Sequence, residues 1–364
     1  MKIKLSRDDL LRSVQIVQNI ISTQSTLPIL SNLLMDVRGN KAHLTTTDLD
    51  LGVSCAVDVR AEEDGAVTIP AKKFSDIIRE LPGDEVDIVV KKNNSTHIRS
   101  EQAYFKLMGI SKDEFPKLPA FENKEFIVIQ QAVLKNILEK TVFAISKDET
   151  RYILNGILLE VEEGVIGMIS TDGRRLALVK KKQDLPQGFK KKAVIPVKTI
   201  YELSRNLSIR GEVRIIFSDN QICFEFNGIT IISRLIEGDF PDYTQVIPKP
   251  VKNKVRVNKK DFLRAIKRVA LFTNPDSKAI KVDILKNKMI LSKNSPDLGE
   301  AKDELDIEYG GNEMSIGFNP VYLLDVLKVL EEEMVSLEVV DPQKPAVIRS
   351  GDENIFIVLP MQLV

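Results

Sequence analysis

The feature that most constrains the fold of this chain is an internal repeat. Three segments, beginning near Ile3, Phe126 and Val255, each join a short alternating strand to an amphipathic helix. In each helix the apolar residues recur at the spacing of one buried helix face. The period is about 125 residues, which is the size of a domain and longer than a solenoid repeat. The sequence therefore predicts three similar domains.

Each repeat contains a second strand and helix, which begin near Val67, Val194 and Ile316. More strand-like runs follow each helix, so every predicted domain holds two copies of one strand-helix-strands unit. We predict an α+β fold in which two helices per domain pack on antiparallel sheets. The predicted domains are 1–122, 123–250 and 251–364, with linkers at 119–123 and 248–250.

Composition narrows the class of protein. The chain has 364 residues, with 52 basic and 52 acidic side chains, so bulk charge does not attract it to nucleic acid. Cys55 and Cys223 lie far apart in strand-like runs, and we interpret both as core residues of a cytoplasmic protein in a reducing compartment. No apolar run is long enough to span a bilayer, which predicts no membrane partner.

Catalytic patterns are not found. His43 and His97 have no cysteine or carboxylate at ligand spacing, and we expect surface histidines. Asp48 and Asp50 resemble a metal pair, but a turn at a strand end is the favoured interpretation because no further carboxylates support a metal. The sequence contains no phosphate loop, dinucleotide fingerprint or nucleophile elbow. We predict no catalytic residue, no metal and no cofactor.

Basic residues lie along several predicted helices. The fifth helix carries Lys260, Arg264 and Lys267 on one face. A solvated surface explains any single helix of this kind. The pattern gains meaning only if the domains arrange the helices around one hole. The acidic run 331–333 after the sixth helix has no role in this interpretation.

Several ordered motifs carry a resemblance to a known family. They lie at 26–30, 46–49, 69–74, 105–107, 151–156, 171–176, 240–243, 316–319 and 359–363. Over essentially its whole length the chain resembles the beta subunit of bacterial DNA polymerase III, the sliding-clamp family. The resemblance implies a non-catalytic homodimer, joined head to tail into a six-domain ring whose helices line the hole. Such a ring holds duplex DNA by topology, which agrees with zero net charge.

The resemblance also implies partners and sites. The partners are double-stranded DNA, the polymerase alpha subunit, the clamp loader, and repair polymerases and mismatch-repair proteins that bind through short linear motifs. Candidate dimer residues are Ile77, Leu81, Phe105 and Leu107 in the first domain and Leu271 and Phe272 in the third, although core packing explains some of them equally well. Candidate DNA-facing residues are Lys72, Lys73, Lys147, Tyr152, Lys198, Arg205, Lys260 and Arg264.

A partner-peptide groove between the second and third domains completes the implied sites. Its candidate residues are Arg151, Leu154, Thr171, Gly173, Arg174, Arg175, Leu176, Pro241, Val246, Asn319, Tyr322, Ile357, Leu359, Pro360 and Met361. This set predicts an apolar floor with a polar rim. We interpret 171–173 as a hairpin turn in which Gly173 supplies a positive φ and from which both arginines project.

The chain departs from the family pattern at Arg174, where many relatives have histidine, and at Gln362 and Val364 in the tail. These departures leave the partner preference open. We expect that removing the residues after Leu359 abolishes partner binding and leaves the ring intact.

Two alternatives remain at this point. A duplex-binding regulator would use the fifth helix as a reader and would bind one DNA sequence with steep salt dependence. An enzyme would hold a site at a domain junction, lined by carboxylates with perturbed pKa values.

Overall fold

The computed structural model describes every residue except 22–26, 123, 252–253, 276, 352 and 364. Thr26, Asn123 and Val364, which the sequence analysis used, lie outside the described residues. The chain forms two compact units, Met1–Lys135 with Lys198–Leu235 and Asn136–Val197 with Ile236–Val364. The middle of the chain contributes to both units, so their limits differ from the predicted domain boundaries, which remain a prediction.

The first half of the chain contains β1 (Lys2–Ser6), α1 (Arg7–Val17), β2 (Asn32–Arg38), β3 (Lys41–Thr47), β4 (Leu51–Asp58), β5 (Arg60–Glu63), β6 (Gly65–Pro70), α2 (Ala71–Glu80), β7 (Glu85–Val90), β8 (Ser95–Ser100), β9 (Ala103–Met108), β10 (Phe126–Gln130), α3 (Gln131–Thr141), β11 (Gly156–Glu162), β12 (Val165–Thr171) and β13 (Arg175–Lys182).

The second half contains β14 (Lys191–Pro196), α4 (Val197–Asn206), β15 (Glu212–Phe217), β16 (Gln221–Phe226), β17 (Ile229–Arg234), β18 (Val255–Asn258), α5 (Lys259–Ala270), β19 (Ile280–Leu285), β20 (Lys288–Ser295), β21 (Gly299–Glu308), β22 (Met314–Phe318), α6 (Pro320–Val329), β23 (Met334–Glu338), β24 (Ala346–Ser350) and β25 (Asn354–Val358).

The order of these elements confirms the predicted repeat. Every helix from α1 to α6 follows directly on a strand and is followed by three strands, and β5 is the one addition. Capping residues begin several helices: the side chain of Ser6 accepts from the backbone of α1, Asn258 from α5 and Asn319 from α6. The apolar face of each helix is buried, as the predicted spacing requires.

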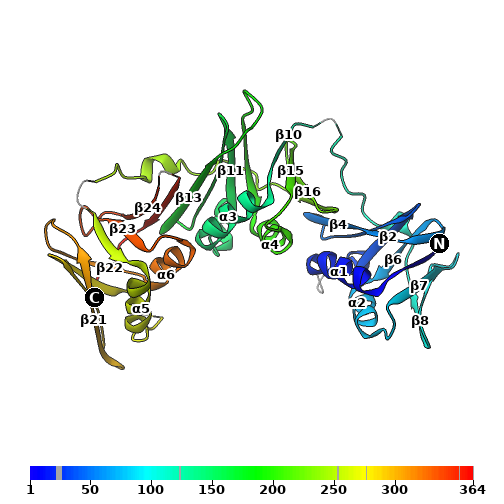
Figure 1. Cartoon of the computed structure of the whole chain (residues 1–364), viewed down its shortest axis with the longest axis horizontal. Helices are drawn as coiled ribbons and strands as arrows, with labels where there is room; N and C mark the ends of the chain where they lie inside the picture. Colours follow the sequence, from blue (N-terminus) through cyan, green and yellow to red (C-terminus); the bar gives the residue numbers. More distant parts are fainter. Residues whose placement is uncertain (22–26, 123, 252–253, 276, 352, 364) are drawn as a thin grey trace. The chain divides into compact units, whose positions relative to one another are not determined.

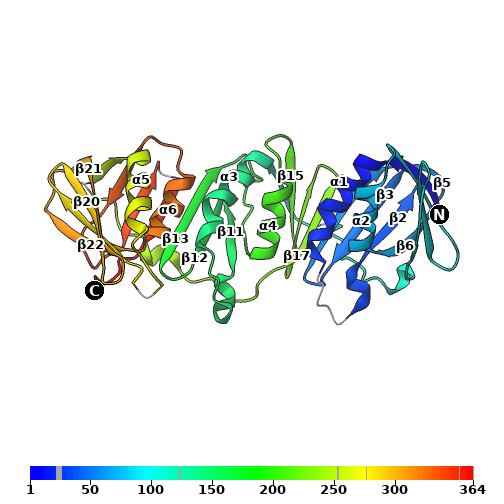
Figure 2. The ribbon, with the colours of Figure 1, turned by 90° about the horizontal axis from the view of Figure 1, so that it is seen from below.

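All strand pairs between named strands are antiparallel. In the first unit, one sheet has the order β5-β1-β7-β8-β9 and a second has the order β10-β15-β16-β17-β4-β3-β2-β6. The helices α1 and α2 lie side by side, with α1 against β3 and β4 and α2 against β2 and β6 (Figure 1 and Figure 2). Cys55 on β4 and Cys223 on β16 are free and buried, which confirms their prediction as core residues.

The second unit contains one sheet with the order β14-β11-β12-β13-β25-β24-β23-β18-β21-β20-β19-β22. The helices α5 and α6 lie side by side, with α5 against β18, β20 and β21 and α6 against β25 (Figure 2). The ladder between β13 and β25 joins strands from different repeats, from the pair Arg175 and Val358 to the pair Val179 and Asn354. This ladder forms the floor on which the candidate site is built.

Candidate protein-binding groove

An apolar groove of about 440 Å³ opens in the second unit above the ladder of β13 and β25. Leu176 and Ile357 are opposite each other in that ladder and form part of the floor. Val246 is 52 % exposed and Leu359 37 % exposed, although both are apolar. The groove is lined by Leu154, Thr171, Gly173, Arg174, Arg175, Leu176, Pro241, Asp242, Tyr243, Gln245, Val246, Ile247, Pro248, Pro345, Ile357 and Leu359. A concave apolar surface with few polar groups is typical of a site for an apolar ligand.

One side of the groove is the turn between β12 and β13. Thr171 Oγ1 donates to the carbonyl of Arg175 at 2.7 Å and accepts from the backbone N–H of Gly173 at 3.0 Å. Asp172 Oδ1 accepts from the backbone N–H groups of Arg174 and Arg175. Gly173 has a φ of +83°, which confirms the predicted turn and its positive φ. A Cβ on Gly173 would lie 2.9 Å from a guanidinium nitrogen of Arg151, so this guanidinium covers the turn.

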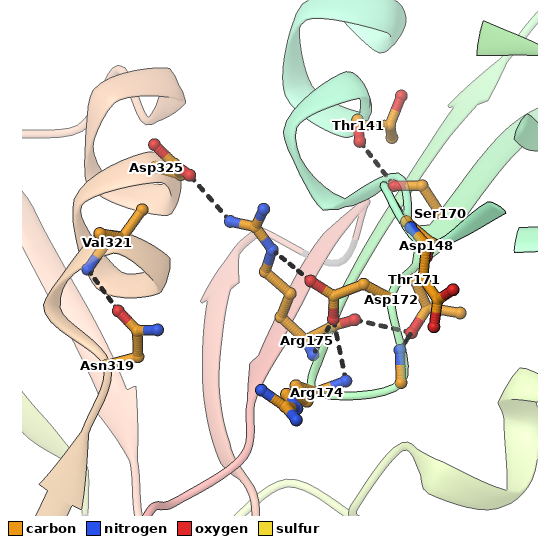
Figure 3. Close-up of polar contacts among 12 residues, drawn as sticks. Thr141, Asp148, Ser170, Thr171, Asp172, Arg174, Arg175, Asn319, Val321 and Asp325 are labelled. Carbon is orange, nitrogen blue, oxygen red and sulfur yellow. Dashed lines mark hydrogen bonds and ion pairs between the residues drawn. The ribbon is translucent and has the colours of Figure 1, made fainter. Parts of the chain in front are cut away.

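The two arginines after this turn differ in position. Arg174 is exposed, as predicted for the rim. The same prediction is wrong for Arg175, which is buried at 9 % exposure. Its guanidinium lies between Asp172 and Asp325 (Figure 3). Its guanidinium pairs with Asp172 at 3.1 Å and with Asp325 of α6 at 2.8 Å, and it stacks on the ring of Tyr322 at 4.5 Å. A buried guanidinium needs such counter-charges, so Arg175 joins the turn to α6 and only its remaining surface reaches the groove.

The opposite wall is the segment 241–248, which contains the short 3-10 helix Tyr243–Val246. Tyr243 is buried, and its hydroxyl donates to Glu160 at 2.5 Å. Burial, followed by the carboxylate of Glu160, raises the pKa of Tyr243. Asp242 caps the helix by accepting from Thr244, and these hydrogen bonds lower the pKa of Asp242. The wall is therefore held by fixed hydrogen bonds rather than by apolar contact alone.

Ten of the predicted groove residues line the groove and five do not. Asn319 is 9 % exposed and caps α6, and Tyr322 lies under Arg175. The residues outside the lining are Arg151, Asn319, Tyr322, Pro360 and Met361. The sequence analysis missed Asp242, Tyr243, Gln245, Ile247, Pro248 and Pro345. Most of these lie between Pro241 and Val246 or directly after Val246, so the continuity of that segment was the available signal.

The tail after Leu359 leaves the groove. The N–H of Leu359 donates to the carbonyl of Arg174 at 2.9 Å, whereas the N–H of Met361 donates to Gly317 of β22 at 2.8 Å. A Cβ on Gly317 would lie 2.3 Å from the carbonyl oxygen of Met361, which shows how closely the tail lies on β22. The tail therefore extends the sheet edge of the third repeat. Removing it would also uncover β22, so the effect expected of the truncation includes a loss of stability.

The acidic run after α6 has a structural role that the sequence analysis did not assign. Glu331 pairs with Lys140 of α3 at 2.9 Å, and the amide of Asn136 donates to it at 3.4 Å. The hydrogen bond and charge of Lys140 lower the pKa of Glu331. Lys181 and Glu353 add an ion pair of 2.5 Å beside the ladder. These contacts join the second and third repeats within one unit and so hold the two sides of the groove together.

The remaining candidate residues lie outside the groove. The candidate DNA-facing residues are all exposed, but Lys198 pairs with Asp48 at 3.0 Å and Arg205 with Glu202 at 2.7 Å. Of the candidate dimer residues, Ile77 and Leu81 are 7 % and 1 % exposed and belong to the core. Phe105, Leu107 and Phe272 are half-buried, and Leu271 is 76 % exposed.

The other residues considered for metal binding or catalysis have local structural positions. Asp48 Oδ1 accepts from the backbone N–H groups of Asp50 and Leu51, which confirms a turn between β3 and β4. His43 is exposed, and His97 contacts Ser95 and Tyr104. The described residues contain no group of three His, Cys, Asp or Glu side chains that could hold a metal. No helix of the described chain is long and apolar enough to cross a membrane.

Comparison with known proteins decides the family. The models of the N-terminal, central and C-terminal domains of the DNA polymerase III beta subunit match residues 1–119, 128–242 and 244–362. The chain belongs to the beta sliding-clamp family. It is 35% identical to the beta sliding clamp of Bacillus subtilis over 376 residues, covering 100% of both chains. It is 31% identical to that of Chlamydia pneumoniae, covering 100% of this chain and 99% of the relative.

Solved sliding clamps have the same fold. The DNA polymerase sliding clamp from Bacillus subtilis superposes with a TM-score of 0.97 at 33% identity, covering 100% of both chains. The clamp from Pseudomonas aeruginosa bound to griselimycin superposes with a TM-score of 0.95 at 32% identity, again over 100% of both. The predicted α+β fold of three clamp domains is thus confirmed. As a beta subunit of this type, the chain is a non-catalytic component of replication and not an enzyme.

Proposed function

We propose that two copies of the chain close head to tail into a ring around duplex DNA. The ring tethers the replicative polymerase and thereby gives it processivity, and it recruits the clamp loader and repair proteins through the groove. Membership of the sliding-clamp family supports the proposal, and the observation that carries it is the apolar groove beside the ladder of β13 and β25. The enzyme alternative has no support, because the groove is apolar.

Two open strand edges support ring closure. β9 is the last strand of its sheet. Within the described part of the chain, β21 pairs with β18 only at Ile307 and Glu308, so residues 299–306 have one edge without a strand partner there. An exposed edge is a ready template for pairing with another chain. The charges are partly complementary. Lys106 of β9 is basic, and Glu300 and Asp306 of β21 have no ion pair among the described residues, whereas Asp303, Glu304 and Glu308 pair with basic residues of the same chain.

Exposed apolar side chains next to these edges mark the contact. Leu271 is 76 % exposed beside α5, and Tyr104 and Met108 on β9 are 50 % and 58 % exposed. We propose that Leu271 and Phe272 of one copy contact Phe105 and Leu107 of the other. Ile77 and Leu81 support that surface from the core. Two such contacts close a ring of two chains.

The mass in solution tests ring closure. We expect Leu271→Asp to dissociate the dimer, because it places a charge in a desolvated contact. Ile209→Asp is the matched control, since Ile209 is 75 % exposed and lies on neither edge. Sedimentation equilibrium should show a dimer for the parent chain and for Ile209→Asp, and a monomer for Leu271→Asp. A monomeric parent chain, or a Leu271→Asp variant that remains dimeric, would contradict the proposed ring.

Uneven charge on the helices supports weak contact with DNA. No ion pair of Lys260, Arg264 or Lys267 on α5 occurs among the residues described, whereas Lys198 and Arg205 on α4 are paired. We propose that α5 and α2 provide most of the attraction to phosphates and that α4 provides little. A few such contacts centre the duplex without fixing the ring on it.

The occupant proposed for the groove is a short linear peptide of a replication or repair protein. The floor accepts apolar side chains. Arg174 offers an exposed guanidinium group at the rim, and the guanidinium of Arg151 lies outside the lining, over the turn at Gly173. A peptide that combines two or three apolar residues with a carboxylate fits this arrangement. Arg174→Glu should weaken such a peptide by about tenfold and leave a peptide without the carboxylate unaffected. Equal losses for both peptides, measured by fluorescence anisotropy, would refute the role of Arg174.

A further inference from the structure

The wall of the groove, residues 241–248, is fixed to the sheet near both of its ends. Near its start, the hydroxyl of Tyr243 donates to Glu160 of β11 at 2.5 Å. At its end, the carbonyl oxygen of Pro248 accepts from Nη2 of Arg349 on β24 at 2.6 Å. Both strands belong to one sheet, but β11 comes from the second repeat and β24 from the third. The third repeat therefore holds the end of a wall that begins in the second.

The guanidinium of Arg349 is oriented by a buried carboxylate. Glu338 of β23 is 2 % exposed and accepts from Nε of Arg349 at 3.3 Å. The same carboxylate pairs with Nζ of Lys254 at 2.8 Å. Glu338 therefore holds Lys254 directly, and it holds Pro248 through Arg349.

Strand register places this ion pair on the face of the sheet that forms the groove floor. Glu338 is opposite Val347 of β24, Val347 is opposite Ile357, and Ile357 is opposite Leu176. Residues directly opposite each other in neighbouring strands point to the same face. Arg349 lies two residues after Val347 and so shares that face. Val347, Ile357 and Leu176 belong to one apolar cluster, so the ion pair borders the floor of the groove.

An ion pair is not needed to fill this space. Apolar side chains of similar volume would pack there at a lower cost of desolvation. A guanidinium differs from an apolar group because it donates in fixed directions to two acceptors at once. Here the two acceptors are the carboxylate of Glu338 and the carbonyl of Pro248. The pair thus fixes where the end of the wall lies.

We propose that Arg349, oriented by Glu338, is a positioning residue that sets the place of the wall and thereby the affinity of the groove. This inference rests on the proposed function, in which the groove binds a peptide. Val246 and Ile247 line the groove between the two fixed points of the wall, and Ile247 packs on the apolar cluster of the floor. Arg349 is not among the lining residues, so it acts on a bound peptide only through the wall.

Amide hydrogen exchange of the full chain tests this role without any ligand. In Arg349→Met the amides of Val246 and Ile247 should exchange about tenfold faster, the equivalent of one lost hydrogen bond to a charged donor. Arg349→Lys keeps a positive charge beside Glu338 and should keep the Tm of the parent chain. A lysine lacks the planar fork, so exchange of the wall should still rise. A purely structural role of Arg349 predicts that Arg349→Lys restores the exchange of the parent chain.

Val282→Ala is the matched control for stability. Val282 is fully buried on β19 of the same repeat and does not line the groove, so its truncation should lower the Tm and leave the exchange of the wall unchanged. Should Arg349→Met fail to fold, Arg349→Lys carries the test. Unchanged exchange of the wall in the Arg349 variants, or an equal rise in Val282→Ala, would overturn the proposal.

Fluorescence anisotropy connects the wall to binding. The probe is a fluorescein-labelled peptide that contains one aspartate and two leucines. Its Kd should rise about tenfold in both Arg349 variants and stay unchanged in Val282→Ala. Faster exchange with an unchanged Kd would also overturn the proposal. A parent chain that does not bind the peptide would contradict the function proposed for the groove, and hydrogen exchange would still decide whether Arg349 positions the wall.

Discussion

Two junctions between repeats are built in the same way, and only one of them carries the groove described here. At the first, β4 pairs with β17, and Gly52 is opposite Ile232. At the second, β13 pairs with β25, and Leu176 is opposite Ile357. At the first junction, the side chain of Leu118 occupies the space over Gly52. It lies 2.6 Å from the place that a Cβ on Gly52 would take. Together with Phe121 it packs on Ile216, Cys223 and Ile232.

The corresponding segment at the second junction covers only part of the floor, because Tyr243 packs in one cluster with Leu176 and Ile357 while the groove stays open beside it. Phe115-Pro116 and Phe240-Pro241 align at a spacing of about 125 residues, which places Tyr243 where Leu118 is and Val246 where Phe121 is. The hydroxyl of Tyr243 is held by Glu160, and Val246 is 52 % exposed. The same ladder therefore occurs at both junctions, whereas a groove forms only where the segment above the ladder leaves part of it uncovered.

The turns at the two junctions share their backbone geometry but differ in the cation beside them. Thr47 and Asp48 make the same hydrogen bonds as Thr171 and Asp172, and Leu49 has a φ of +81° where Gly173 has +83°. The cations differ. Lys198 beside Asp48 is 74 % exposed, whereas Arg175 beside Asp172 is 9 % exposed and also reaches Asp325.

The largest expected effect follows from this difference in burial. Arg175→Ala leaves Asp172 and Asp325 without their buried partner and should lower the free energy of unfolding by about 3–5 kcal/mol. Lys198→Ala, which removes the cation that pairs with Asp48 at the first junction, should cost about 0–1 kcal/mol because solvent screens that pair. Urea unfolding of both variants measures the difference. Similar losses for the two would show that the two turns are equally buried in solution.

Much of this arrangement was predictable from sequence, and part of it was not. Periodicity predicted all six helices, because burial of one face follows from local spacing. The burial of Arg175 was not predictable, since its partner Asp325 is far away in the sequence and belongs to another repeat. For the same reason the role of Glu331 was missed, because Lys140 is even more distant in the sequence.

Two of the predicted groove residues have structural roles in this chain. Asn319 begins α6, and Met361 pairs with Gly317. Both are structural residues next to the groove. A motif therefore identifies a neighbourhood, and only the packing separates lining residues from those that support them.

The second expected effect concerns the positive-φ residue of each turn. Gly173→Leu should reduce affinity for a partner peptide by at least tenfold, because its side chain displaces Arg151 and enters the groove mouth. It should also cost about 1–2 kcal/mol of stability through the strained φ. Leu49→Gly should relieve the same strain and change stability by less than about 1 kcal/mol. Peptide titration together with thermal unfolding distinguishes the two results, and unchanged affinity in Gly173→Leu would place the peptide elsewhere.

A smaller effect is expected at the wall of the groove. Tyr243→Phe removes the hydrogen bond to Glu160 and should destabilise the second unit by about 1 kcal/mol. Release of the wall should also raise the Kd of a bound peptide a few-fold. Leu118→Ala at the matching position should reduce stability without any change in peptide affinity. An affinity change of equal size in both variants would show that the two junctions are not independent.

The smallest expected effect is a difference in acid response between the units. The ion pair with Lys140 holds the pKa of Glu331 below the usual value of a glutamate, so its contribution to stability is present above that usual value and is lost as the pH falls below it. Burial raises the pKa of Glu202 in the first unit, so protonation of Glu202 favours that unit as the pH falls. Hydrogen exchange followed as the pH falls below about 4.5 should show earlier loss of protection in α3 and α6 than in α4. The opposite order would contradict these assignments.

Retention on DNA tests the central claim most directly. The protein is loaded on nicked circular duplex with a clamp loader and ATP, and the same DNA is then cut once. A ring that holds DNA by topology stays on the circle at moderate salt and is lost when the circle is opened. Equal retention on the circular and the linear form would mean that direct contacts hold the DNA, and the proposed ring would then be wrong.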